Sequence, residues 1–480
     1  MAFTDRLHNR GSISTGYEID NSLKFEADNS EYMDRVITTQ GNQKTFTISA
    51  WVKRTEVNSS VDGFGHTFFF GGAYGNEAVI LRFNTGTTSN VDALQIGIGI
   101  GTTQNRSYTQ RKFRDTSAWY HIVLAVDTTQ ATATDRFKLY VNGVLETEYA
   151  SRNNPAQNLD TGNNKAQSAT YANNIGAYKS AGTVYGKFCG YIAEVYNIDG
   201  SALAPTEFGE FDEDSGIWKP KAYTGSFPNN SFYLDFQDSS DLGAQAKGDD
   251  RTFTTYNITS ADQATDTPTN NFCTLNPLYN YAYGNTITEG ATKIYGAANN
   301  WGGGKAAFGL TSGKWYWEIK QLANGNTFMG IQTDGEDNIS SGNAHSQNTT
   351  VCFYTDGTIQ YSNGSETSTS AANSIAANSI VGFALDLDSA TQTIKVYNNN
   401  SLVTAFGSSG TANLSTYNIA DKTVFPFVAL YDRTVNMNFG GYTVSSISSP
   451  QSDANGYGNF EYSPPSGYYA LCTKNLEEYG

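Results

Sequence analysis

Short segments in which apolar and polar residues alternate recur along most of the chain. In the segment FTISAWV (46–52), Phe46 and every second residue after it share one face, and Thr47, Ser49 and Trp51 share the other. The segment GKWYWEIK (313–320) places Trp315, Trp317 and Ile319 on one face in the same way. A period of two is typical of β-strands that turn one face to a core. The pattern therefore predicts strands, with Trp51, Trp315 and Trp317 buried.

The residues between these segments are typical of turns, and signals for helices are scarce. Asn142-Gly143 follows one apolar segment directly and predicts a tight hairpin, because both residues accept a positive φ. Residues 202–208 (ALAPTEF) form the one convincing helix start of the first half, with a proline near the first turn. Pro464-Pro465 argues against helix in the last residues, so we expect them to lie extended across the edge of a sheet.

Composition supports an all-β fold. The 480 residues include 47 Gly, 31 Tyr and 27 Phe, while only 16% are charged and 38% are hydrophobic. So many aromatic residues and so few charges exclude a disordered chain. The length exceeds that of one ordinary core. We therefore expect two antiparallel β-sandwich (jelly-roll) domains joined by an acidic, turn-rich connector.

The charge balance and the apolar runs limit the possible partners. The formal net charge is −16, and such a surface repels phosphate backbones, so we expect no nucleic-acid partner. No apolar run approaches the length that crosses a membrane, so we expect no membrane insertion. The first residues (MAFTDRLHNRG) lack the apolar stretch of a secretory signal, which indicates synthesis and assembly in a cytoplasm.

A search for catalytic and metal-binding patterns finds none at recognisable spacing. Glu18-Ile19-Asp20 begins the carboxylate pattern of a glucanase, but the next acid, Glu26, lies too far along the chain. The four cysteines are far apart and form no C-x-x-C pair, and the four histidines show no ligand spacing. We therefore expect no catalytic residues, no metal and no cofactor, and four reduced, mostly buried cysteines. His121, inside an apolar strand, is interpreted as a hydrogen-bonded structural residue.

Five ordered segments carry a first family resemblance. They read FTISAWVK, WYHIVLAVDTT, RFKLYVNG, NIGAY and FCGYIAEVYNIDGSAL. In this order they resemble a concanavalin A-like jelly-roll domain of the laminin-G-like kind, over residues 17–209. The resemblance implies two curved antiparallel sheets with loops at the rim, and binding of glycan or protein more often than catalysis.

A second set of segments resembles the SPRY domain. It reads GKWYWEI, FMGI, VGFALDLD, TIKVYNNN, VFPFVAL and VNMNFG. The resemblance implies a second sandwich that binds partners through variable loops, here the segments 333–350 and 363–379. The expected organisation is an N-terminal docking arm (1–16), a laminin-G-like sandwich (17–209), a connector (210–282), a SPRY-like sandwich (283–445) and an extended C-terminal tail (446–480).

The segment DTPTNNFCTLNPL (266–278) resembles the joint between lectin-like and SPRY modules in structural proteins of tailed bacteriophages, particularly marine ones. This resemblance implies a non-enzymatic virion protein, tail-fibre or adhesin-like, that binds host-surface glycan or protein. A capsid or tail decoration that binds other virion proteins is the alternative, and a polysaccharide-degrading enzyme is a third hypothesis. A virion location implies other virion proteins as partners and a homo-oligomer.

Three aromatic residues in glycine-rich loops are the candidate ligand-binding residues. They are Tyr74 in GGAYG, and Tyr295 and Trp301 in the glycine-rich run before the SPRY-like core. Flat rings contact the C–H faces of sugars, while Asn, Asp and Gly groups bind the hydroxyls. Packing of such a ring over flat backbone is the alternative interpretation of each residue.

Overall fold

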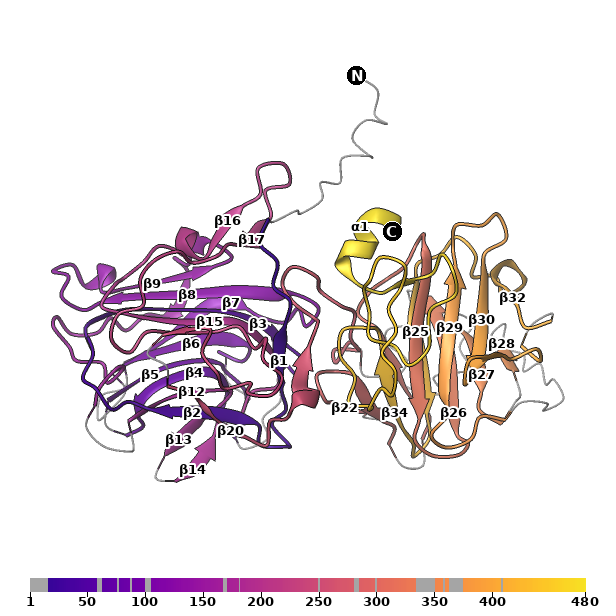
Figure 1. Cartoon of the computed structure of the whole chain (residues 1–480), viewed down its shortest axis with the longest axis horizontal. Helices are drawn as coiled ribbons and strands as arrows, with labels where there is room; N and C mark the ends of the chain where they lie inside the picture. The colour runs from indigo at the N-terminus through magenta and orange to yellow at the C-terminus, as the bar shows by residue number, and fades with distance from the viewer. Residues whose placement is uncertain are drawn as a thin grey trace, which may run out of the picture. The chain divides into compact units, whose positions relative to one another are not determined.

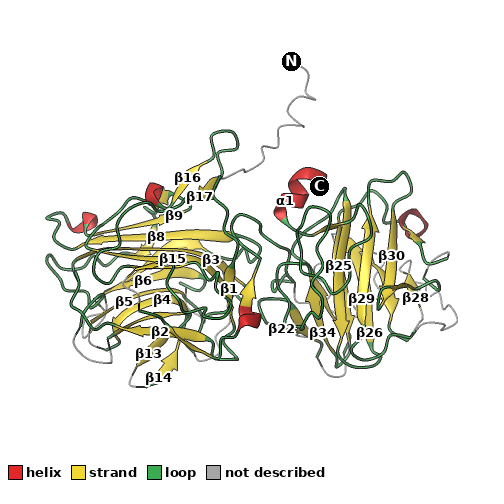
Figure 2. Ribbon diagram, viewed as in Figure 1, coloured by secondary structure: helices red, strands yellow, loops and turns green. Residues whose placement is uncertain are grey.

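The computed structural model describes residues 16–480 except 58–62, 76, 87–88, 100–104, 167–170, 181, 249–250, 280–284, 298–299, 334–349, 357–358, 362–373 and 407–408. Strands dominate the described residues, as Figure 2 shows, and the predicted all-β class is confirmed. No helix among these residues has both the length and the apolar character needed to cross a membrane. The predicted docking arm (1–16) lies outside the described residues, apart from Gly16.

The chain divides into two compact units, Met1–Thr269 and Asn270–Gly480. Figure 1 draws the first from indigo to magenta and the second mainly in orange and yellow. The boundary lies at residues 269/270, inside the segment expected to be a connector. Residues 210–269 belong to the first unit and residues 270–282 to the second.

The first unit is an antiparallel β-sandwich. One sheet has the order β10 (Val144–Leu145), β9 (Phe137–Val141), β8 (Trp119–Asp127), β3 (Thr45–Arg54), β15 (Gly190–Asp199), β1 (Ser22–Phe25), β21 (Gln263–Ala264), with β18 (Phe232–Leu234) paired to β15 and β19 (Lys247–Gly248). The facing sheet has the order β11 (Tyr149–Ser151), β7 (Arg106–Lys112), β6 (Ala93–Ile98), β5 (Glu77–Phe83), β4 (His66–Ala73), β12 (Ala172–Ile175), β2 (Tyr32–Val36), β20 (Thr254–Tyr256). Smaller elements are the hairpins β13 (Tyr178–Ser180)–β14 (Thr183–Tyr185) and β16 (Gly209–Phe211)–β17 (Trp218–Pro220), and the 3-10 turns η2 (Ala133–Asp135), η3 (Pro205–Glu207) and η4 (Ser260–Asp262).

Strand β3 shows how the alternating pattern forms this unit. Phe46, Ile48 and the alternate residues after them lie in the core between the sheets, as predicted. Trp51 is buried too, but on the opposite face of the sheet, where it stacks on His121 at 4.6 Å between ring centroids. The prediction that Trp51 is buried is therefore confirmed, although Trp51 is buried on the outer face of the sheet and not in the core between the two sheets.

The Asn142-Gly143 hairpin also forms as predicted. Asn142 and Gly143 have φ values of 48° and 77°, and Val144 pairs with Val141 across the turn. The Oδ1 atom of Asn142 accepts a hydrogen bond from the backbone N–H of His121 at 2.8 Å. The predicted helix start at 202–208 is a single 3-10 turn, η3, with Pro205 in its first turn.

Most of the expected connector, residues 210–269, belongs to the first unit, and its buried charges pair with strand residues. Asp266 accepts hydrogen bonds from the Lys53 ammonium at 2.6 Å and from Trp119 Nε1 at 3.0 Å. Asp262 pairs with Lys24 at 2.8 Å. A buried charge is stable only when it is paired, so these contacts hold residues 262–266 against β1, β3 and β8. Charge patterns alone did not reveal this pairing.

The second unit is also a sandwich. One sheet has the order β22 (Thr286–Thr288), β23 (Lys293–Tyr295), β34 (Thr434–Asn438), β25 (Lys314–Gln321), β29 (Ile380–Asp386), β30 (Thr393–Asn398), β31 (Ser401–Leu402), with β32 (Ala412–Asn413) paired to β30 and β35 (Tyr469–Ala470) paired parallel to β25. The facing sheet has the order β24 (Gly302–Lys305), β33 (Val424–Leu430), β26 (Thr327–Thr333), β27 (Thr350–Tyr354), β28 (Ile359–Tyr361). A 3-10 turn, η6 (Leu414–Tyr417), precedes β33.

The core of the second unit confirms the predicted tryptophan pair. Trp315 and Trp317 are fully buried in one apolar cluster, and Trp317 stacks on Phe383 at 5.3 Å between ring centroids. On the other face of β25, Tyr316 and Glu318 are also buried. The C-terminal residues cover that face.

The C-terminal tail differs from the prediction. Residues 469–470 form β35, but Thr473–Tyr479 form the helix α1, and residues 464–465, the prolines, lie before both. A proline disfavours helix in the residues that precede it and not in those that follow, so the chain is free to form a helix eight residues later. The four cysteines are free and buried, as expected.

Candidate functional site

Two of the predicted binding residues, Tyr295 and Trp301, lie on one loop at one end of the second unit. Strand β23 ends at Tyr295 and β24 begins directly after Trp301. The hydroxyl of Tyr295 donates to the Asp432 carboxylate at 2.7 Å, and the backbone N–H of Asp432 donates to the carbonyl of Ala297 at 3.3 Å. This loop is therefore joined to the turn between β33 and β34.

The ring of Trp301 contacts three other aromatic rings. Its centroid lies 5.0 Å from that of Phe328, 5.7 Å from that of Tyr431 and 6.1 Å from that of Tyr354. Phe328 is buried, whereas Trp301, Tyr354 and Tyr431 are half-buried. One part of Trp301 thus packs on the sandwich, and another part of its surface stays accessible.

Amide and charged groups surround these rings. The hydroxyl of Tyr354 donates to Asn326 Oδ1 at 3.3 Å, and the backbone N–H of Tyr431 donates to the Asn326 carbonyl at 3.1 Å. Arg433 Nε donates to the carbonyl of Asn324 at 3.0 Å. We call this group the aromatic rim: Tyr295, Trp301, Asn324, Asn326, Tyr354, Tyr431, Asp432 and Arg433.

The turns that form the aromatic rim follow from local sequence. Asn326 and Asp432 have φ values of 56° and 50°, which Asn and Asp adopt more readily than other side chains. Asn324-Gly-Asn326 lies between the predicted strands GKWYWEI and FMGI, and Asp432-Arg433 lies between VFPFVAL and VNMNFG. These turn signals mark the loops, but no local signal shows that the two loops meet.

The aromatic rim offers flat rings beside hydrogen-bonding groups. Tyr295 is 41% exposed, and its hydrogen bond to Asp432 raises the pKa of its hydroxyl. The phenol therefore keeps its proton at neutral pH and holds the ring in place. Apolar ring surface next to carboxylate, amide and guanidinium groups is suited to a ligand with both C–H faces and hydroxyls, or to a polar protein loop.

The third predicted residue, Tyr74, lies elsewhere, in the first unit. Its ring stacks on that of Tyr178 at 4.7 Å, and Tyr178 in turn contacts Phe70 and Tyr185 at 5.7 and 5.6 Å between centroids. Tyr74 is half-buried in this aromatic layer. Tyr295 and Trp301 thus contact neighbouring residues of one turn, Asp432 and Tyr431, whereas Tyr74 belongs to the first unit.

Glu194 is a buried acid that the sequence analysis did not consider. It lies at a bulge in β15 with φ of 53°, and its carboxylate accepts hydrogen bonds from the hydroxyls of Tyr17, Tyr196 and Tyr233 at 2.7, 2.9 and 2.5 Å. Burial raises its pKa. Three donors surround the carboxylate, and the side chain is 4% exposed, so this arrangement is that of a structural acid.

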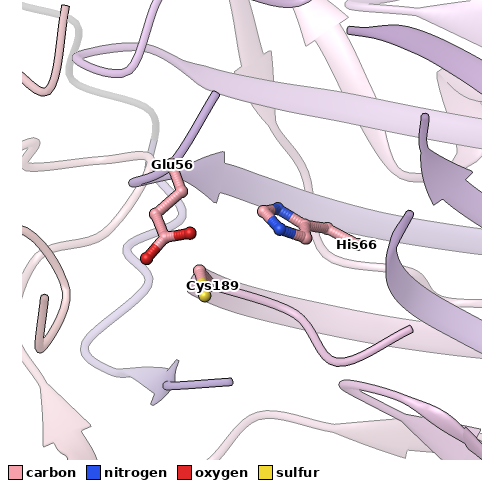
Figure 3. Close-up of side chains that lie close together, drawn as sticks. All are labelled: Glu56, His66 and Cys189. Carbon is pink, nitrogen blue, oxygen red and sulfur yellow. The ribbon is translucent and has the colours of Figure 1, made fainter. Parts of the chain in front are cut away.

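A second cluster of chemically active side chains lies in the first unit, and Figure 3 shows it: Glu56, His66 and Cys189. One potential ligand atom from each lies within 4.8 Å of the others. Burial, and next the Arg54 guanidinium, lower the pKa of His66 to about 3, so its imidazole is neutral at neutral pH. Burial, and next the carboxylate of Glu26, raise the pKa of the Cys189 thiol. No local pattern in the sequence indicates this cluster, because Cys189 is far from Glu56 and His66 in the chain.

The family profile of the concanavalin A-like lectin/glucanases superfamily matches residues 26–201. These residues form a concanavalin A-like, laminin-G-like jelly-roll domain, so the predicted resemblance of the first module is confirmed. The superfamily includes both binding proteins and enzymes. No curated protein sequence matches the chain significantly.

Parts of the chain are similar to several solved structures. They include the SPRY domain of human HERC1 (17% identity, 34% of this chain and 96% of that one, TM-score 0.26), domain 4 of AbnA, a GH43 extracellular arabinanase from Geobacillus stearothermophilus, in complex with arabinotriose (22%, 35% and 65%, 0.23), and the heptameric SAP-like pentraxin from Limulus polyphemus (14%, 39% and 78%, 0.28). At these identities and TM-scores the likenesses carry no information about function.

Proposed function

We propose that this protein is a non-enzymatic binding protein and that the aromatic rim of the second unit contacts its ligand, a neutral glycan or a protein loop. The observation that carries the proposal is the exposed ring of Tyr295, held by Asp432 beside the half-buried Trp301. The net charge of −16 disfavours anionic polymers as ligands at low salt. A rim site buries little area, so single-site affinity is weak.

The biological setting belongs to the same proposal. The order of the two modules and the segment 266–278 support a tailed-bacteriophage virion protein, tail-fibre or adhesin-like, that binds the host surface. Several copies in a homo-oligomer on one particle would multiply weak contacts into firm attachment. Labelled antibody applied to intact particles tests this setting. Label at the fibre tips supports attachment, whereas label over the capsid favours the decoration role.

A glycan array probed with the full chain tests the binding site. We expect neutral glycans to bind the protein, and we expect Tyr295→Ala to lose most of that binding while the melting temperature is retained. Phe211→Ala is the matched control, since Phe211 is a 48% exposed aromatic residue of the first unit. Equal loss of binding in both variants, or in neither, would contradict the proposed site. Release of reducing sugar from a bound glycan would contradict the non-enzymatic role.

A further inference from the structure

Three strand ends of the first unit converge on Glu56, His66 and Cys189. Glu56 follows the end of β3, Cys189 directly precedes β15, and His66 is the first residue of β4. Strands β3 and β15 are neighbours in one sheet, whereas β4 belongs to the facing sheet. Figure 3 shows the ring of His66 facing the other two side chains. A group bound here would therefore join the two sheets of the sandwich.

His66 is the unusual member of this cluster. It is 1% exposed, and neither ring nitrogen has a hydrogen-bond partner among the described residues. His121, the other buried histidine among the described residues, uses both nitrogens, bonding Ser49 Oγ at 2.8 Å and Trp218 Nε1 at 2.9 Å. A buried polar group without a partner is destabilising, so its retention calls for an explanation. A ligand atom supplied by a bound ion would provide one.

The donor set indicates the class of ion. Thiolate and imidazole are ligands of Zn²⁺ and related transition metals, whereas Ca²⁺ and Mg²⁺ take oxygen ligands. A carboxylate completes sets of this kind. Glu26, whose Oε1 lies 3.5 Å from Cys189 Sγ, adds a second acid next to the sulfur. Two acids and a thiol in a buried setting favour a dication over an anion.

The spacing is compatible with an ion after a small movement. Bonds of about 2.0–2.3 Å to a tetrahedral Zn²⁺ leave ligand atoms roughly 3.3–3.8 Å apart. The three atoms here lie within 4.8 Å of one another, so closure by at most about 1–1.5 Å is sufficient. Glu56 is only half-buried and follows a strand end, so rotation of its side chain can bring its carboxylate closer to the other two ligand atoms.

We propose that Glu56, His66 and Cys189 bind a transition-metal dication, Zn²⁺ or a close relative, which links the two sheets of the first unit. Cys189 loses its thiol proton to solvent when the metal binds, and the metal takes that place beside Glu26. The fourth position is left to water or to Glu26. This site is independent of the aromatic rim and of the role proposed for it.

A cobalt titration of the full chain tests the proposal. After dialysis against a chelator, addition of Co²⁺ should produce the near-ultraviolet sulfur-to-cobalt charge-transfer absorption and saturate at about one ion per chain. Added Zn²⁺ should abolish the absorption and raise the melting temperature, because the ion binds only the folded state. Absence of both the absorption and the thermal shift in the unmodified protein would overturn the proposal. That result does not depend on the folding of any variant.

Substitutions then assign the ligands. Cys189→Ser should remove the charge-transfer absorption, and His66→Gln should weaken Co²⁺ binding at least tenfold, which is about 1.4 kcal/mol. Cys352→Ser is the matched control, because Cys352 is also fully buried but lies in the second unit. Unchanged absorption in Cys189→Ser, or equal loss in Cys352→Ser, would place the metal elsewhere and overturn the assignment.

Discussion

The two units bury the outer face of a central strand in different ways. In the first unit, Trp218 of β17 covers the sheet and donates through Nε1 to Nδ1 of His121 on β8. In the second, the carboxylate of Glu318 on β25 accepts hydrogen bonds from the backbone N–H groups of Glu461 and Tyr462, both at 2.9 Å. In each case a polar side chain on a strand binds a segment that lies outside the two large sheets of its sandwich.

We call His121 and Glu318, the side chains that bind these covering segments, the histidine anchor and the acidic anchor, and their chemistry predicts opposite responses of stability to pH. Burial lowers the pKa of His121 to about 3, so the folded state favours the neutral imidazole. Burial raises the pKa of Glu318, although four donors offset part of this cost. Desolvation therefore disfavours the charged form of both groups. The charged form is the protonated one for His121 and the deprotonated one for Glu318, so the two groups should change the stability with pH in opposite directions.

The largest effect on stability should come from a substitution in the core between two sheets and not from one on a covered outer face. Trp317→Ala should lower the free energy of unfolding by about 3–5 kcal/mol, because it removes a fully buried ring from between two sheets. Trp51→Ala, on the covered outer face of β3, should cost less. Chemical unfolding measures both changes. A loss below about 1 kcal/mol for Trp317→Ala would contradict its place in the core.

Removal of the acidic anchor should have the next largest effect. Glu318→Ala leaves the N–H groups of Glu461 and Tyr462 without their acceptor and should cost about 1–3 kcal/mol. The pKa of Glu318 is also raised in the folded state, so Glu318 keeps its proton at pH values at which the unfolded chain loses it. Stability therefore falls as pH rises from 4.5 through the raised pKa, and this contribution should vanish in the variant.

Unfolding of Glu318→Ala at several pH values, with exposed Glu213→Ala as the control, checks this prediction. The same pH dependence in all three proteins would show that Glu318 does not contribute to it.

The histidine anchor should show the reverse trend. Between pH 6.5 and about 3 the unfolded state binds a proton that His121 in the folded state does not. The free energy of unfolding should thus fall by ~1.4 kcal/mol per pH unit as pH falls through this window, and above it His121 should have no effect. His121→Gln should flatten this slope. An unchanged slope in the variant would assign the acid sensitivity to other groups.

The smallest effect should distinguish two hairpins in related positions. Gly143 has a φ of 77°, and an added Cβ would meet the Trp218 ring, so Gly143→Ala should destabilise the first unit by about 1 kcal/mol or more. In the second unit Asn400, after β30, has a φ of 66°. Asn400→Gly should change stability by less than about 0.5 kcal/mol. Equal changes in the free energy of unfolding for Gly143→Ala and Asn400→Gly would contradict this difference between the two hairpins.

The sequence by itself determined the features that depend on neighbouring residues. Strands follow from a period of two that puts Trp315 and Trp317 on one face, and that face has to be buried. The turn at Asn142-Gly143 follows from residues that tolerate a positive φ. The loop that holds Tyr295 and Trp301 was found from its aromatic and glycine residues alone. Whether these two residues bind a ligand stays a prediction.

Only the tertiary structure decided which distant residues meet. Asp432 reaches Tyr295 because β34, which begins two residues after Asp432, pairs with β23. Glu56, His66 and Cys189 converge because two neighbouring strand ends of one sheet meet a strand end of the facing sheet, so no spacing in the chain predicts the cluster. Residues 262–266 joined the first sandwich because its buried Lys24 and Lys53 require acids. Pairing across long separations depends on which elements pack against one another, and local patterns of residues do not encode that.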